Sequence, residues 1–314
     1  MSFSCRIVVL FLIVLFSGSC ANGVWAQVWS AKVQRDVIYK EVNGKKILLN
    51  IALPVDENGK TRENAPLLIW IDSGCWYSDN PGNGGIWGMM KLWERGCAVA
   101  SVSTRSLATD AFPAQIEDVK AAVRFLRAHA EEYGIDENRI AVSGASSGGH
   151  LSNMLGMSDE FRLFDVGENL EESSQVNVVI NFYGPTDFSV LLDRHVGVEC
   201  IYLALGDKPR KGRTLADMTP EMKEMALKCS PITYVTGKSA PTLTFHGVMD
   251  TIVPVSQGAL YYEALKSRGV RTELWTSNTG VHDIGTLGES ELLARKILEF
   301  IGWEELKMSE SAEK

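Results

Sequence analysis

A short glycine-rich turn between a predicted strand and a predicted helix most constrains how this 314-residue chain can fold. Residues 139–143 form a short β-rich run, residues 144–148 read Gly-Ala-Ser-Ser-Gly, and residues 147–157 have the pattern of a helix. A G-x-S-x-G match is weak by itself, but a strand, a tight turn and a helix around it are typical of a nucleophile elbow. We therefore predict that Ser146 is a nucleophile. Ser147 and a plain Gly/Ser turn without function are the alternatives.

Strand-like and helix-like segments alternate along most of the chain. Residues 36–42 and 46–53 flank Asn43-Gly44, which predicts a hairpin. Further strands are predicted at 66–72, 97–103, 176–182, 242–245 and 271–276, and further helices at 113–133, 255–268 and 289–301. This alternation predicts an α/β fold, a mostly parallel central sheet with helices on both faces and the hairpin at one edge. Ligands of such sheets bind at the carboxyl ends of the strands, where we expect the chemistry.

Domain organisation follows from length and composition. Hydrophobic residues make up 45% of the chain, and no shift in composition divides it, so we expect one large domain at residues 27–314. Residues 187–242 break the alternation, with a polar run and few strand signals. Long excursions in compact domains are usually functional, so a small cap insertion is predicted at about residues 188–240. An ordinary surface excursion is the alternative.

The N-terminus has the features of a targeting signal. Arg6 precedes an apolar run at residues 7–16, which is too short to span a bilayer, and residues 24–26 fit a cleavage site. We expect a signal peptide at residues 1–26, a secreted or periplasmic protein, and no membrane span. A retained N-terminal anchor is one alternative. Another is a lipoprotein anchored at Cys20, whose context is similar to a relaxed bacterial lipobox.

The net charge indicates which classes of partner the chain can bind. Removing the signal takes away one basic and no acidic residue, so the net charge changes from −8 to −9. With no basic run, the sequence gives no support for nucleic-acid binding.

Export permits disulfides, and Cys200 and Cys229 flank one polar segment and form a candidate pair. The cysteine spacings do not match a zinc site, and no metal is predicted.

A serine nucleophile needs a base and an acid that orients it. His282 lies in a loop after the last predicted strand, and Asp250 follows the strand at residues 242–245, so these two are the predicted base and acid. Asp187 is the alternative acid, although it is expected to cap the next helix. The other histidines of the mature chain are less favourably placed: His129 inside a helix, His150 at the buried start of a helix with an expected structural role, His195 in the proposed cap, and His246 at a strand end.

Several segments together resemble a known family. Residues 112–115, 140–151, 181–187, 230–235 and 246–254 are similar to the secreted carbohydrate-esterase and lipase/esterase branch of the α/β hydrolases, which includes feruloyl-esterase-like and acetylxylan- or pectin-acetylesterase-like enzymes. The chain order Ser, Asp, His is that of the superfamily. The resemblance covers nearly everything after Asp36. It implies an α/β-hydrolase fold and hydrolysis of short acyl esters, acetyl or feruloyl, on plant polysaccharides. It also implies that no cofactor is used.

Residues 72–76 depart from the family pattern. They read Asp-Ser-Gly-Cys-Trp where these enzymes usually have His-Gly-Gly-Gly-Trp. We predict that the backbone N–H of Ser147, with that of Gly74 or Cys75, binds the developing oxyanion. The added side chains are expected to favour short acyl groups. Trp76 is the candidate for substrate binding, by stacking on a sugar ring; a position in the core is the alternative.

Two other functions compete with a serine esterase. A serine peptidase of the prolyl-oligopeptidase type shares this catalytic domain but generally carries a large propeller, for which the chain has no room. A catalytically inactive hydrolase used as a carbohydrate-binding protein is supported only by the altered residues 72–76.

Overall fold

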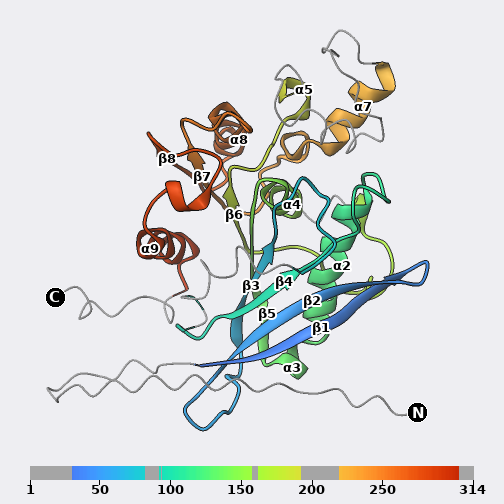
Figure 1. Cartoon of the computed structure of the whole chain (residues 1–314), viewed down its shortest axis with the longest axis vertical. Helices are drawn as coiled ribbons and strands as arrows, with labels where there is room; N and C mark the ends of the chain where they lie inside the picture. Colours follow the sequence, from blue (N-terminus) through green and yellow to red (C-terminus); the bar gives the residue numbers. More distant parts are fainter. Residues whose placement is uncertain (1–29, 82–91, 93, 158–161, 192–218, 304–314) are drawn as a thin grey trace, which may run out of the picture.

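The computed structural model describes residues 30–81, 92, 94–157, 162–191 and 219–303, and Figure 1 shows their arrangement. The strands are β1 (Ser30–Val42), β2 (Lys45–Val55), β3 (Ala65–Ile71), β4 (Ala98–Val102), β5 (Ile135–Ala145), β6 (Val178–Phe182), β7 (Thr242–Gly247) and β8 (Thr272–Ser277). The helices are α2 (Ala114–Ala128), α3 (Ala130–Tyr133), α4 (Ser147–Leu155), α5 (Phe188–Leu191), α7 (Pro220–Cys229), α8 (Val255–Ser267) and α9 (Ser290–Ile301).

The strands form one eight-stranded sheet in the order β1-β2-β4-β3-β5-β6-β7-β8. β2 pairs antiparallel with both β1 and β4, and every other pair is parallel. The predicted hairpin at the edge is confirmed: Asn43 and Gly44 have φ angles of 50° and 78°, as a two-residue turn of this kind requires. The predicted fold class, a mostly parallel sheet with helices, is confirmed as well.

The strand order indicates where on the sheet a binding crevice is expected. From β3 the chain crosses to β4 on one side, and β5 then returns to the other side of β3. At such a switch point the loops leave the sheet in opposite directions and open a crevice at the carboxyl ends of the strands. Residues 72–76 follow β3 and the turn at Ser146 follows β5, so both lie at this crevice.

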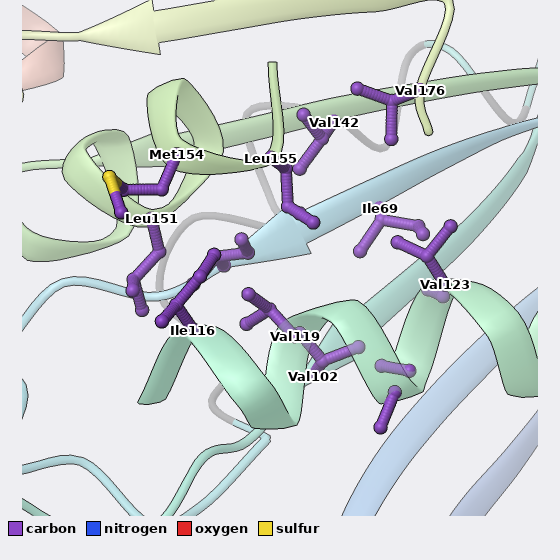
Figure 2. Close-up of a cluster of buried hydrophobic side chains, with 14 of the residues drawn as sticks. Ile69, Val102, Ile116, Val119, Val123, Val142, Leu151, Met154, Leu155 and Val176 are labelled. Atoms are coloured by element: carbon purple, nitrogen blue, oxygen red, sulfur yellow. The ribbon is translucent and has the colours of Figure 1, made fainter. Parts of the chain in front are cut away.

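Helices cover both faces of the sheet. Alternate residues of β3 point to opposite sides: Leu67, Ile69 and Ile71 pack with α2 and α4, while Leu68 and Trp70 pack in the cluster that contains α9. Figure 2 shows the first side, where Ile116, Val119 and Val123 of α2 and Leu151, Met154 and Leu155 of α4 lie over strand residues. Burial on both faces explains why β3 is a continuous apolar run.

The helix predicted at residues 113–133 is divided in two. α2 ends at Ala128, and His129 has non-helical dihedrals, φ −107° and ψ 22°. The His129 ring stacks on Phe125, with centroids 4.2 Å apart, and its Nδ1 lies 2.8 Å from the Phe125 carbonyl oxygen. The backbone N–H of His129 donates to the same carbonyl oxygen at 3.1 Å, so this oxygen accepts two bonds where the helix is interrupted. α3 then ends, as predicted, at Gly134, with φ 65°.

Part of the predicted cap is described. It comprises α5, α7 and a short 3₁₀ helix at Pro231–Tyr234. Thr219 is the N-cap of α7, and its hydroxyl accepts a hydrogen bond from the Met222 N–H. The predicted signal peptide, Cys20, His195 and Cys200 lie outside the described residues, so the pairing of Cys200 with Cys229 stays a prediction. No helix in the described part of the chain is both long and apolar enough to cross a membrane.

Candidate active site

Ser146 lies in a tight turn between β5 and α4. Its dihedrals, φ 53° and ψ −118°, are sparsely populated for a residue with a side chain, and such strain costs on the order of 1–3 kcal/mol. Two backbone hydrogen bonds hold the turn: Ser146 N–H donates to the Phe182 carbonyl at 2.9 Å, and His150 N–H donates to the Ser146 carbonyl at 2.9 Å. The strand, turn and helix predicted from residues 139–157 are therefore present.

The small neighbours of Ser146 are required by close backbone approaches. A Cβ atom on Gly148 would overlap the carbonyl oxygen of Ile71, and one on Gly144 would overlap the backbone of Gly148. A Cβ atom on Gly149 would lie 2.6 Å from Oδ1 of Asn181. The turn is thus clamped between the ends of β3 and β6.

The structure brings His282 to Ser146. The imidazole Nε2 lies 2.9 Å from the Ser146 hydroxyl oxygen, and Nδ1 lies 2.7 Å from Oδ2 of Asp250. Because a carboxylate only accepts, Nδ1 carries the ring proton and the Nε2 lone pair faces the hydroxyl. This tautomer is the one that a general base at Nε2 needs.

Asp250 is fixed by its own loop, between β7 and α8. Its Oδ1 accepts the N–H groups of Ile252 and Val253, each at 2.9 Å, which leaves Oδ2 for His282. Asp187, the alternative acid, instead accepts the N–H of Ser189 at 2.9 Å at the start of α5. The structure therefore joins Asp250, and not Asp187, to the imidazole.

Sequence reasoning did not assign site roles to His246 and Tyr183. His246 is buried in β7; its Nε2 lies 2.8 Å from the Val253 carbonyl oxygen and 3.6 Å from Oδ2 of Asp250. Burial lowers its pKa, so the ring is neutral at neutral pH. The Tyr183 ring lies 4.5 Å from that of His282, centroid to centroid. Tyr183 directly follows β6, and His246 lies near the carboxyl end of β7. This position at the ends of parallel strands is the sequence signal that could have identified both residues.

Residues 72–76, here called the oxyanion loop, adopt an unusual backbone. Gly74, Cys75 and Trp76 have φ angles of 123°, 55° and 61° in succession. The Ser73 N–H is bonded to its neighbour Asp72 at 2.9 Å. By contrast, the Ser147 and Gly74 N–H groups donate to no other described residue. Among the described residues, no acceptor therefore takes up the N–H groups of these two predicted donors.

Trp76 is not placed as the sequence suggested. It is only 8% exposed, its ring packs against His150 and Phe188, and its indole N–H donates to Nδ1 of His150 at 3.1 Å. The buried ring has no open face for a sugar. The sugar-stacking role is therefore corrected: Trp76 belongs to the core beneath the oxyanion loop.

A small cavity adjoins the nucleophile turn. Its volume is about 10 Å³, and its walls include Asp72 and Ser73 of the oxyanion loop together with Ser147 and Leu151 of α4. That volume is about the least that a single water molecule needs. Within the described residues, no group of three His, Cys, Asp or Glu side chains is arranged to hold a metal ion.

Comparison with known proteins finds esterases among the similar sequences and structures. Residues 49–265 match the family model described as BD-FAE. The chain is 30% identical to Esterase LipC of Mycobacterium tuberculosis over 203 residues. The matched region covers 65% of this chain and 49% of LipC. The chain thus spans about half the length of this curated relative.

Two solved structures are similar over about nine tenths of the chain. A "Truncated form of carbohydrate esterase from gut microbiota" has a TM-score of 0.72 and 25% identity, and the match covers 91% of this chain and 100% of that one. A "Bifunctional GH43-CE" of Bacteroides eggerthii has a TM-score of 0.72 and 28% identity, with coverage of 88% and 35%.

Proposed function

This chain belongs to the BD-FAE family of α/β-hydrolase esterases, and on that premise we propose that it is a serine esterase that hydrolyses carboxylic esters. Ser146 is the proposed nucleophile, His282 the base and Asp250 the acid. One observation carries this assignment: three side chains from distant parts of the chain form a continuous hydrogen-bonded series at the carboxyl end of the sheet.

The proposed reaction is a two-step acyl transfer. Nε2 of His282 takes the proton of the Ser146 hydroxyl as the oxygen attacks the ester carbonyl, and the Ser147 and Gly74 or Cys75 N–H groups bind the resulting oxyanion. The alcohol leaves with the proton from His282, and an acyl-enzyme remains. Water, deprotonated by His282, then attacks the acyl-enzyme and releases the acid. Asp250 stabilises the imidazolium in both steps.

The proposed substrates carry short acyl groups, acetyl or feruloyl, on plant polysaccharides. Two facts support this class. The two solved structures of similar fold include one named a carbohydrate esterase. Ser73 and Cys75 carry side chains where the family usually has glycines, and this added bulk favours a short acyl group over a long chain. Of the two alternatives, a peptidase should cleave peptide substrates faster than esters, and an inactive binding protein should hydrolyse neither.

The test is the release of acetate and ferulate from a panel of xylans and pectins, with the Ser146→Ala variant as the blank. Release of either acid by the wild-type enzyme and not by the variant is the expected result. Acetyl and long-chain p-nitrophenyl esters then test the acyl preference, and faster turnover of the long chain would contradict it. Cleavage of peptides in preference to both ester classes would overturn the esterase assignment.

We also propose that the protein is exported, on the strength of residues 1–26. Mass spectrometry of the mature protein from its native host distinguishes the alternatives. A mature chain that begins at Gln27 supports a cleaved signal peptide, and a diacylated Cys20 supports a lipoprotein. A chain that retains residues 1–26 in the cytoplasm would contradict export.

A further inference from the structure

We propose that His150 is a positioning residue that holds the oxyanion loop in shape and links that loop to the end of helix α7. The inference rests on the proposed esterase function and extends it to a residue outside the triad. His150 lies in α4, shortly after Ser146, and only 2% of it is exposed. It is thus fixed to the same rigid helix that carries the nucleophile turn.

Both ring nitrogens of His150 are engaged. Nδ1 lies 3.1 Å from the indole nitrogen of Trp76, and Nε2 lies 2.7 Å from the carbonyl oxygen of Cys229. An indole N–H can only donate and a carbonyl oxygen can only accept. The proton of the neutral ring is therefore on Nε2, and the Nδ1 lone pair receives the indole. One tautomer satisfies both partners, and a doubly protonated ring would lose Trp76.

The oxyanion loop needs contacts of this kind. Cys75 and Trp76 adopt positive φ angles, which residues with side chains keep only where the surroundings fix them. Two hydrogen bonds fix the loop backbone: Leu107 N–H donates to the Trp76 carbonyl at 2.8 Å, and Tyr77 N–H donates to the Gly74 carbonyl at 2.9 Å. The bond to His150 fixes the side chain of Trp76 and so completes the anchoring of the loop.

The same imidazole contacts the described part of the proposed cap. Cys229 is the last residue of α7, and the Phe188 ring of α5 lies 5.0 Å from the His150 ring and 6.0 Å from that of Trp76, centroid to centroid. The Phe188 N–H donates to the Ser230 hydroxyl at 2.8 Å, which ties α5 to the end of α7. A displacement of α7 would therefore move the imidazole of His150, and through its bond to Trp76 would shift the oxyanion loop.

Two substitutions at position 150 separate the two hydrogen bonds. His150→Asn places its polar atoms at the level of Nδ1 and keeps an acceptor for Trp76. His150→Gln places them at the level of Nε2 and keeps a donor for Cys229, but leaves the indole without an acceptor. Trp76→Phe removes the indole N–H and keeps an aromatic ring. His129→Gln, at the end of α2, is the matched control for a histidine-to-glutamine change.

With p-nitrophenyl acetate, we expect His150→Gln and Trp76→Phe each to lower kcat about 10- to 100-fold with little change in KM, because oxyanion contacts strengthen mainly in the transition state. The double variant should be no slower than His150→Gln, because both substitutions remove the same hydrogen bond, from the Trp76 indole N–H to Nδ1 of His150. His150→Asn should lose less than His150→Gln, and His129→Gln should match the wild-type enzyme. Fluorophosphonate titration of active sites corrects every kcat for unfolded protein.

Several results would overturn the inference. These are a wild-type kcat in Trp76→Phe, equal losses in His150→Asn and His150→Gln, or losses in kcat that multiply in the double variant. If His150→Gln fails to fold, Trp76→Phe still decides, because it keeps His150 and its bond to α7. Failure of the proposed function is separate: the wild-type protein itself would then show neither turnover nor titratable sites.

Discussion

The carbonyl oxygen of Ile71, the last residue of β3, occupies the space that a side chain on Gly148 would need. This close approach sets the distance between the oxyanion loop and the start of α4, and so between the two proposed sources of oxyanion-binding N–H groups. The position is therefore sensitive to the smallest possible addition, a methyl group.

Gly148→Ala is expected to force the two backbones apart. Overpacking of this kind costs about 1–3 kcal/mol of the free energy of unfolding, and misplacement of the reacting groups should lower kcat about 100-fold. Denaturant unfolding and p-nitrophenyl acetate turnover measure the two effects. Gly237→Ala is the control, since its Cβ would make one tight contact, with a carbonyl oxygen at 3.3 Å, but would not overlap the backbone. Equal behaviour of the two variants would contradict the explanation.

Asp250→Asn tests the assignment of the acid. An amide at this position no longer stabilises the imidazolium, and its NH₂ group can donate to His282 and favour the wrong tautomer, so kcat should fall about 10³- to 10⁴-fold. Asp187→Asn should keep a kcat close to that of the wild-type enzyme, because Asp187 bonds to Ser189 at the start of α5. Steady-state kinetics with active-site titration decides between them. The reverse pattern would make Asp187 the acid.

Acid should destabilise the fold through His150. Burial lowers the pKa of this side chain from 6.5 to about 4. Between those pH values the unfolded chain binds a proton that the folded chain does not, so the free energy of unfolding falls as the pH falls. The contribution from pH 7 to pH 4 is on the order of 3 kcal/mol.

Denaturant unfolding at a series of pH values between 7 and 4 measures this effect. The fall should be smaller in His150→Asn, which has no titrating ring. His246 has its pKa lowered by burial as well, so a fall of the same sign should persist in the variant. Identical pH dependence of the variant and the wild-type protein would exclude His150 as a source of acid sensitivity.

Much of the fold and of the candidate site was predictable from local patterns. Ser146 is signalled by its small neighbours and its position between a strand and a helix, and His282 and Asp250 by their places after strands. These signals are reliable because the carboxyl ends of parallel strands converge at one edge. Only a structure shows that the three side chains meet within hydrogen-bonding distance.

Contacts between distant segments were not predictable. Trp76 has the position of a substrate-binding aromatic, but its indole N–H is taken up by His150 and its ring is buried. The interruption of the helix at His129 coincides with a bond from its side chain to the Phe125 carbonyl. Periodicity reveals neither side-chain contact.

Labelling with a fluorophosphonate tests the central claim most directly, because the reagent reacts only with an activated hydroxyl. The account predicts that mass spectrometry finds the adduct on Ser146 and that Ser146→Ala is not labelled. It also predicts that His282→Ala reacts at least about 10³-fold more slowly, while His129→Ala reacts at the wild-type rate. An adduct on another residue, or labelling of His282→Ala at the wild-type rate, would contradict it.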